Sequence, residues 1–395
     1  MKILYNDDTL KKGTEIMTIY VIVENNYITP AWFANSLRGL EEAAKSHKMN
    51  VAFADDVRSV PAGTRSVVVV GTNRGWIHAA LSSARHRKLR PILIGAVPGS
   101  YGEDVSGTMY GSRSTIEEMV RYFYYYNRRH IALVEINQNG SNDCAKYESF
   151  LNIAKQLQIQ SGYNDVYFKG SGSHNPTEDF LRKIRDYNGV ICSNDYSAAF
   201  ILAYCRENGI RVPEDLFVAG LGDMSICRYT LPSLTSATRS YYEAGVQIYH
   251  IFRTLSQNPE VESIVTTMRS SLKPRGSTAN LPVVDLTPDE SKSETVSVDS
   301  TKPYVANGIG RIKDLEACLN QCDDRDLKII AGVLQGTGNE MIAEALNCSV
   351  GTVNYRLKNL YKAAGVTTKG ELKELIRHNL SAEALIEDAQ GKIIR

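Results

Sequence analysis

The sequence predicts a two-lobed α/β core, built on two parallel sheets flanked by helices, followed by an all-α domain. Short β-branched runs alternate with amphipathic helical stretches as far as Leu221. The alternation restarts after an aromatic helix predicted over residues 116–126, and from Ile312 onward the pattern is helical only. Repetition of strand, helix and strand implies right-handed crossovers within a parallel sheet. Because this repetition restarts, two sheets are favoured over one.

The predicted core covers residues 16–278, after an N-terminal extension of residues 1–15. Its strands are expected where β-branched and aliphatic residues cluster between turn residues. These strands are Ile16–Val23, Val51–Ala54, Ser66–Gly71, Pro91–Gly95, Ile131–Glu135, Asn164–Phe168, Gly189–Ser193 and Leu216–Leu221. Between the first two, a helix is predicted because Phe33, Leu37, Leu40 and Ala44 recur at helical spacing.

A change of composition after Thr278 predicts a linker over residues 279–309. Between Pro282 and Ser300, five acidic side chains are opposed by Lys292 alone. Segments with few large apolar residues and one dominant sign of charge repel themselves and remain extended. We therefore expect a flexible acidic tether between the core and an all-α domain of residues 310–395.

Two short helices in the all-α domain have the spacing of a helix-turn-helix. The first is predicted over Asn339–Leu346 and the second over Val350–Ala363, with Ser349 as its N-cap and Gly365 closing it. Val353, Leu357 and Leu360 form the apolar stripe of the second helix. Its opposite face is polar and basic, which is the arrangement by which such a helix enters the major groove of DNA.

Residues 323–380 resemble the LuxR/GerE-type DNA-binding domain, a four-helix bundle. The resemblance is carried by Arg325-Asp326, Gly338-Asn339-Glu340-Met341-Ile342-Ala343, Ser349-Val350-Gly351-Thr352-Val353, Leu357-Lys358-Asn359-Leu360-Tyr361 and Gly365-Val366. It implies that Asn354, Tyr355 and Lys358 enter the major groove and that Thr352 contacts phosphate. The residues expected to bind double-stranded DNA are Ser349, Thr352, Asn354, Tyr355, Lys358 and Lys362.

The side-chain chemistry of this helix suits DNA. Asparagine can pair bidentately with adenine, and lysine can contact guanine or neutralise phosphate. The segment from Val350 to Lys373 has five basic residues against Glu371 alone, and Arg356 is expected to face outward with the others. A solvated basic face on a bundle that binds another protein is the alternative that the residues leave open.

The core resembles the effector-binding core of lactose-repressor (LacI) family regulators, which has the type I periplasmic-binding-protein fold. The resemblance is carried by Cys192-Ser193-Asn194-Asp195-Tyr196-Ser197-Ala198, Gly209-Ile210-Arg211-Val212-Pro213-Glu214-Asp215-Leu216, Val218-Ala219-Gly220-Leu221-Gly222-Asp223, Pro232-Ser233-Leu234-Thr235 and Arg275-Gly276-Ser277-Thr278. It implies two lobes, residues 16–128 with 239–262 and residues 129–238 with 263–278. The chain would cross between them near Arg128, Thr238 and Ser263, and a small molecule would bind between the lobes.

Residue by residue, the resemblance suggests the cleft and shows where this chain departs from the family. The family's ligand-binding arginine falls on Lys146, its Asn-Asp pair on Asn194 and Asp195, one of its paired aspartates on Asp223, and a glutamine position on Arg239. Tyr27 and Trp32, in the first loop, offer aromatic stacking surfaces for a sugar. One carboxylate fewer and two cations more favour an acidic or phosphorylated sugar.

Structural interpretations of the same residues stay open at this stage. Asn194 and Asp195 could only cap the helix that follows them. Asp223 could only fix its own turn, and Trp32 could belong to the core. A cleft that binds nothing would leave the core as a dimerisation scaffold.

No catalytic residue, cofactor or metal is expected, because no phosphate-binding, metalloprotease, nucleophile or dinucleotide motif is present. The seven cysteines match no zinc or redox spacing, and Cys318 and Cys322 lie simply one helical turn apart. The N-terminus shows no secretory pattern, so a cytoplasmic protein without membrane contact is expected. The sequence thus predicts a homodimeric transcription regulator with a sugar-class effector. The alternative from another class is the solute-binding protein of a transport system.

Overall fold

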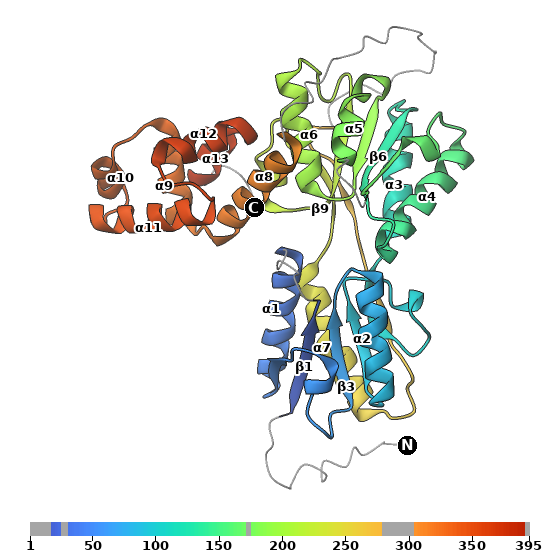
Figure 1. Ribbon diagram of the computed structural model, residues 1–395. Helices are drawn as coiled ribbons and strands as arrows, with labels where there is room; N and C mark the ends of the chain where they lie inside the picture. Colours follow the sequence, from blue (N-terminus) through green and yellow to red (C-terminus); the bar gives the residue numbers. More distant parts are fainter. Residues whose placement is uncertain (1–16, 25–30, 171–174, 279–303, 392–395) are drawn as a thin grey trace, which may run out of the picture. The chain divides into compact units, whose positions relative to one another are not determined.

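The computed structural model describes residues 17–24, 31–170, 175–278 and 304–391 (Figure 1). The chain divides into two compact units, Met1–Tyr110 with Ser240–Met268 and Gly111–Arg239 with Arg269–Arg395. The first crossing between them therefore follows Tyr110 rather than lying near Arg128, so the aromatic helix belongs to the second unit. Among the described helices, none has the length and apolar content needed to cross a bilayer.

The first unit is built on a six-stranded parallel sheet with the strand order β11-β5-β4-β3-β1-β2. Its core is formed by aliphatic side chains that line both faces of the central strands. The strands are β1 (Thr18–Val23), β2 (Asn50–Phe53), β3 (Ser66–Val70), β4 (Arg90–Ile94), β5 (Ser106–Tyr110) and β11 (Val265–Met268).

Three helices cover this sheet, α1 (Ala31–Ser46) and α7 (Tyr241–Gln257) on one face and α2 (Arg74–His86) on the other (Figure 1). Helices α1 and α7 approach each other closely at glycines. A Cβ atom on Gly39 would lie 2.0 Å from the carbonyl oxygen of Tyr242, and one on Gly245 would lie 1.8 Å from that of Ser36. Only glycine allows backbones to come this close.

The second unit contains another six-stranded sheet, in the order β12-β10-β9-β8-β6-β7. All its strands are parallel except β12, which runs antiparallel to β10. The strands are β6 (Ile131–Ile136), β7 (Val166–Phe168), β8 (Gly189–Cys192), β9 (Phe217–Gly222), β10 (Thr235–Thr238) and β12 (Leu272–Lys273). One face is covered by α3 (Ser112–Tyr125) and α4 (Ser141–Leu157), the other by α5 (Pro176–Leu181) and α6 (Asp195–Glu207).

The predicted fold class is confirmed, and each of the predicted strands is present within a few residues of its expected bounds. Four strands were not predicted from their own residues: β5, β10, β11 and β12. In β10, Thr235 and Ser236 are completely buried, and hydrogen bonds with hydroxyl groups hold them in place rather than apolar contacts. Such short polar strands lack the β-branched apolar signal on which strand prediction depends.

The C-terminal helices, α8 to α13, form a helical unit that we call the module. The predicted bounds of its central helix are confirmed, with Ser349 as N-cap and Gly365 in the left-handed conformation just beyond its end. The helices are α8 (Tyr304–Gln321), α9 (Asp324–Gln335), α10 (Asn339–Ala345), α11 (Val350–Ala363), α12 (Lys369–Asn379) and α13 (Ala382–Ala389).

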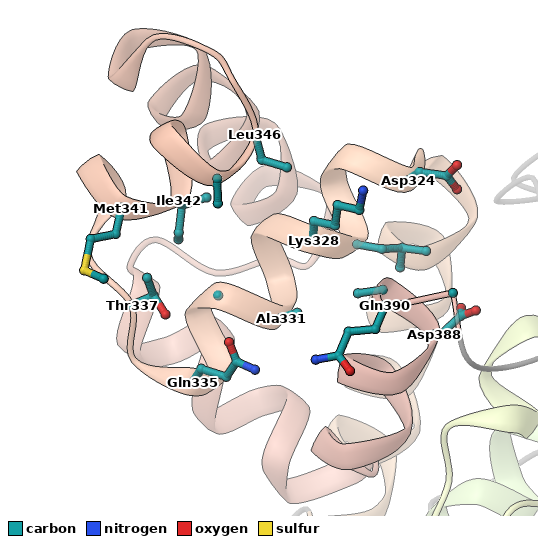
Figure 2. Close-up of a pocket in the computed structure, with 15 residues that line it drawn as sticks. Asp324, Lys328, Ala331, Gln335, Thr337, Met341, Ile342, Leu346, Asp388 and Gln390 are labelled. Atoms are coloured by element: carbon teal, nitrogen blue, oxygen red, sulfur yellow. The ribbon is translucent and has the colours of Figure 1, made fainter.

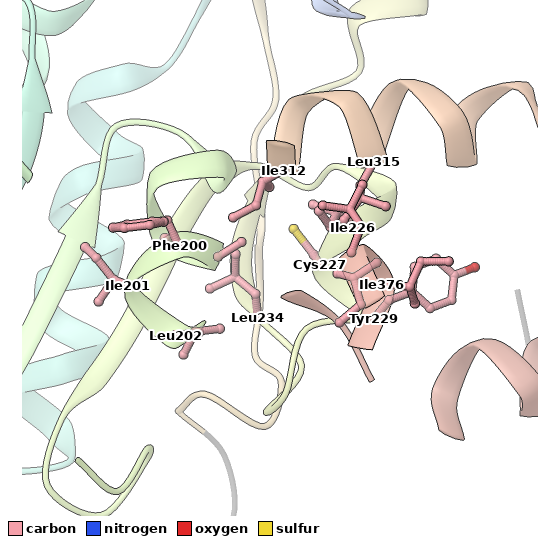
Figure 3. Close-up of a cluster of buried hydrophobic side chains, with 14 of the residues drawn as sticks. Phe200, Ile201, Leu202, Ile226, Cys227, Tyr229, Leu234, Ile312, Leu315 and Ile376 are labelled. Carbon is pink, nitrogen blue, oxygen red and sulfur yellow. The ribbon is translucent and has the colours of Figure 1, made fainter. Parts of the chain in front are cut away.

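The module packs directly on the second unit's α/β part, and one continuous apolar cluster runs through both (Figure 3). In this cluster, Ile312 and Leu315 of α8 join Phe200 of α6, and Ile376 of α12 lies beside Tyr229. All five side chains are buried. The docking is therefore a hydrophobic contact of the kind that holds a domain core together.

Polar contacts in the same interface are fully paired. Both carboxylate oxygens of Glu316 accept backbone N–H bonds from the short helix η5 (Ser225–Arg228), from Ser225 at 3.0 Å and Ile226 at 2.7 Å. Burial raises the pKa of Glu316 above its usual value, although these hydrogen bonds oppose the shift. The Tyr229 hydroxyl donates to Asp388 at 2.5 Å.

The predicted linker over residues 279–309 differs from the structure at its end. Up to residue 303 it lies outside the described residues, but residues 304–309 belong to α8. Asn307, Gly308 and Gly310 made this stretch unlike a helix, because glycine has low helix propensity. Gly308 is required by packing, since a Cβ atom there would lie 2.3 Å from the ring of Phe200.

Candidate DNA-binding surface and ligand site

Helix α11 presents the predicted DNA-binding residues on a single face. The Ser349 hydroxyl caps the helix by accepting the Thr352 backbone N–H at 3.1 Å. The stripe of Val353, Leu357 and Leu360 is buried against the module. The recognition face is the opposite side, and it consists of Thr352, Asn354, Tyr355, Lys358 and Lys362.

The recognition face is open to solvent. Tyr355 is 67% exposed, an unusual position for a large aromatic ring. Lys358 and Lys362 are exposed at one-turn spacing, which lets both ammonium groups point to the same side. An exposed face with two cations, an amide and an aromatic ring is suited to phosphate contact and base contact together.

Arg356 does not take part in this face, contrary to the prediction that it points outward. Its guanidinium pairs with Asp323 at 2.9 Å and with Asp326 at 2.8 Å, at the start of α9. The hydrogen bonds that its guanidinium donates to these two carboxylates raise the pKa of Arg356. The residue therefore ties α11 to α9 and contributes little free positive charge.

A separate apolar groove lies on the module between α9, α10 and α13 (Figure 2). Its volume is about 770 Å³, and its lining includes Leu327, Ala331 and Ile342, with Met341 at the rim. No lining residue comes from α11. The groove is thus distinct from the recognition face.

In the second unit, Lys146 lies on α4 in a buried ion pair. Its ammonium is 2.6 Å from the Asp143 carboxylate and 3.4 Å from the Ser193 carbonyl oxygen. Burial lowers the pKa of Lys146, an effect that Asp143 opposes and the nearby charge of Arg239 reinforces. The charges of Lys146, Asp143 and Arg239 thus act on one another within the second unit.

Asn194 and Asp195 follow strand β8 and both have structural roles. Asn194 caps α6 by accepting from the backbone N–H of Ser197 at 3.0 Å. Asp195 is completely buried, and its carboxylate accepts from Ser236 at 2.5 Å and from the Met224 backbone at 2.9 Å. Burial raises the pKa of Asp195. The capping interpretation therefore holds for Asn194, and Asp195 acts within the interior.

Asp223, just after β9, has a left-handed backbone with φ of 52°. Its carboxylate pairs with Lys273 at 2.7 Å and with Arg275. Burial opposes ionisation, but these two cations hold the pKa of Asp223 below its usual value. Asp223 thus fixes the turn after β9 to the end of the core.

In the first unit, Trp32 belongs to an aromatic cluster. Its ring centroid lies 6.4 Å from that of Tyr241, which in turn lies 5.5 Å from that of Tyr110. Trp32 also packs on the apolar core, as the core interpretation expects, and its role as a stacking surface for a ligand stays a prediction. Tyr110, at the end of β5, and Tyr241, at the start of α7, were not among the predicted residues, because β5 and α7 were not predicted. Tyr27 lies outside the described residues.

Comparison with known proteins agrees with this architecture. Residues 120–278 match the periplasmic binding protein-like domain family, and residues 324–374 match the luxR family of bacterial regulatory proteins. The HTH-type transcriptional regulator IdnR of Escherichia coli is 37% identical over 67 residues, 17% of this chain and 20% of that protein. The probable HTH-type transcriptional repressor ExuR of Bacillus subtilis is 20% identical over 64% of this chain and 78% of its own length.

Among solved structures, the transcriptional regulator CelR–cellobiose complex is similar with a TM-score of 0.59 and 15% identity, over 66% of this chain and 84% of that one. A LacI family regulator from Enterococcus faecium with bound ribose is similar with a TM-score of 0.54 and 19% identity, over 67% and 100%. At such identities the likeness establishes the fold. The chain spans only 20% and 28% of the lengths of two of its curated relatives, IdnR and GalR of Escherichia coli.

The two family matches fall on different parts of the chain, one on the second sheet and one on helices α9 to α12. Their order also differs from that expected of lactose-repressor relatives, in which the DNA-binding headpiece precedes the core. The chain therefore carries a periplasmic-binding-protein-like core, with the fold of LacI-family regulators, followed by a C-terminal helix-turn-helix DNA-binding domain of the luxR family.

Proposed function

We propose that this protein is a ligand-responsive transcription regulator that binds double-stranded DNA through α11. The observation that carries the proposal is the recognition face, where Tyr355, Lys358 and Lys362 are exposed on a helix whose other side is buried. Lysines on such a face neutralise phosphates, which supplies most of the affinity for DNA. The protein would act in the cytoplasm as a homodimer, presenting two modules to a roughly symmetric operator.

The effector in this proposal is a small molecule of the sugar class, bound by the core. Relatives of the same fold bind cellobiose and ribose. In this chain, the Lys146–Asp143 pair and Arg239 interact electrostatically, and they supply groups that bind hydroxyls and anions. Lysine and arginine side chains form charge-assisted hydrogen bonds with phosphate and carboxylate groups, which supports a phosphorylated or acidic sugar.

The signal in this proposal passes through the docked module. Because α8 and α12 share an apolar cluster with α6, the module moves with the second unit. Effector binding that changes the closure of the lobes would then change the separation of the two modules in a dimer. A flexible tether alone would transmit such a change poorly.

Selection from a random library of double-stranded DNA tests the proposal on the full chain. We expect wild type to enrich a defined sequence, and Lys358→Ala with Lys362→Ala to lose that enrichment. Lys328→Ala is the matched control, because it removes an exposed lysine from α9, outside the recognition face. If the double variant enriches the same sequence as wild type, the assignment of α11 is wrong.

The effector is tested separately by thermal shift with sugars and sugar phosphates. A rise in melting temperature that Arg239→Ala abolishes supports a ligand site in the core. Absence of any shift would favour the scaffold alternative. If ligands bind but no DNA is selected, the solute-binding alternative is correct.

A further inference from the structure

The orientation of Asn354, an amide on the recognition face, is set by residues outside α11. Its Oδ1 lies 2.9 Å from the Nδ2 atom of Asn339, at the start of α10. The Oδ1 atom of Asn339 lies 2.9 Å from the ammonium of Lys369, at the start of α12. These contacts form a chain of three side chains from three helices.

The direction of these hydrogen bonds follows from the chemistry of Lys369. An ammonium group only donates hydrogen bonds, so Lys369 must face the oxygen of the Asn339 amide. A second bond from Lys369 to the Thr337 carbonyl oxygen, at 2.7 Å, holds the ammonium in place. Asn339 must then present its NH₂ group to Asn354, which can accept it only through Oδ1.

We infer that Lys369 and Asn339 are positioning residues that fix Asn354 with its NH₂ group toward DNA, so that Asn354 recognises a hydrogen-bond acceptor. This inference rests on the proposed function and specifies how one base is chosen. The acceptors on the major-groove edge are guanine N7 and O6, adenine N7 and thymine O4, whereas cytosine presents only an NH₂ donor. Without these contacts, the Asn354 side chain would be free to pair bidentately with adenine, as the sequence alone suggested.

Asn339→Asp gives the sharpest test, because it reverses the direction of the hydrogen bond to Asn354 without changing the size of the side chain. A carboxylate only accepts, so Asp at this position would still accept from Lys369 but would force Asn354 to turn its NH₂ group inward. The Asn354 oxygen would then face DNA and favour a base donor. Asn347→Asp is the matched control, since it adds the same charge in the exposed turn before α11, outside the chain of contacts.

The measurement is the base preference of the full chain at each position of the selected DNA, as ratios of affinity between single-base variants. Ratios cancel the uniform loss of affinity that an added negative charge causes. We expect wild type and Asn347→Asp to prefer an acceptor base at one position by about tenfold. Asn339→Asp should shift that position, and only that one, toward cytosine.

Two further variants keep the inference falsifiable. Lys369→Ala should flatten the preference at the same position, and Lys369→Arg, which retains a donor, should restore it. Unchanged ratios in Asn339→Asp and Lys369→Ala would overturn the inference while leaving DNA binding intact. A wild-type preference for cytosine at that position would overturn it equally, because cytosine presents only a donor. Failure of wild type to bind any DNA would instead contradict the proposed function.

Discussion

The role of a basic residue on α11 depends on whether its side chain has a partner within the protein. Arg356 and Lys358 are both basic and lie two positions apart, yet Arg356 pairs with two aspartates and Lys358 is exposed. The apolar stripe and the Ser349 cap could be predicted, because both depend on local spacing. The pairing of Arg356 could not, because Asp323 and Asp326 come from a different helix.

The different partners of Lys358 and Arg356 predict different effects of replacing each by alanine. Lys358→Ala should weaken DNA binding and lower the slope of log affinity against log salt by about one, because one phosphate contact is lost. Arg356→Ala should lower the melting temperature and leave Asp323 and Asp326 without their shared cation. Titrations at several salt concentrations and thermal melts of each variant measure the two effects. An unchanged salt slope in Lys358→Ala would count against its assigned contact.

Asp223 should make stability depend on pH in a defined direction. Its pKa is lowered in the folded protein by Lys273 and Arg275, so its contribution is present above the unfolded pKa of about 3.9 and is lost as pH falls through the folded value. Asp223→Asn should therefore be less stable than wild type at neutral pH. The difference in melting temperature between wild type and Asp223→Asn should shrink as the pH falls below the unfolded pKa. A difference that stays constant down to low pH would show that the ion pairs do not stabilise the fold.

At the scale of elements, prediction succeeded where a segment carries its own apolar period. Helix α11 and strands such as β3, with the run Ser66–Val70, are of this kind. It failed for β10, whose Thr235 and Ser236 are buried by their neighbours' hydrogen bonds. Prediction also failed for the first turns of α8, where the ring of Phe200 leaves no room for a side chain at Gly308. In both failures the deciding contact comes from a distant part of the chain.

Two glycines of α8 provide a test of the docked module. Gly308→Ala places a Cβ atom 2.3 Å from the buried Phe200 ring, whereas a Cβ atom at Gly310 meets no atom within 4 Å. Overpacking costs about 1–3 kcal/mol, while replacing a helical glycine by alanine gains up to about 1 kcal/mol. Gly308→Ala should therefore melt at a lower temperature than wild type, and Gly310→Ala at an equal or higher one. Equal melting of both variants would mean that α8 does not pack on α6.

At the scale of the whole molecule, the fold class and the order of core and DNA-binding domain could be predicted from patterns along the chain. The docking of the module could not, because it depends on Glu316 and Ile312 matching η5 and α6, which are far away in sequence. The ligand-binding role of the expected residues stays a prediction. Asp195 and Asn194 are engaged within the second unit, and Lys146 already has Asp143 as a partner.

The most direct test of DNA binding through α11 is photo-crosslinking of the full chain to the selected DNA. A photoreactive phenylalanine analogue replaces Tyr355, which is 67% exposed on the recognition face. The same analogue at Tyr163, 59% exposed beside β7, is the control. The account predicts a crosslink to DNA from position 355 and none from position 163. Absence of a crosslink at 355, with DNA still bound, would contradict it.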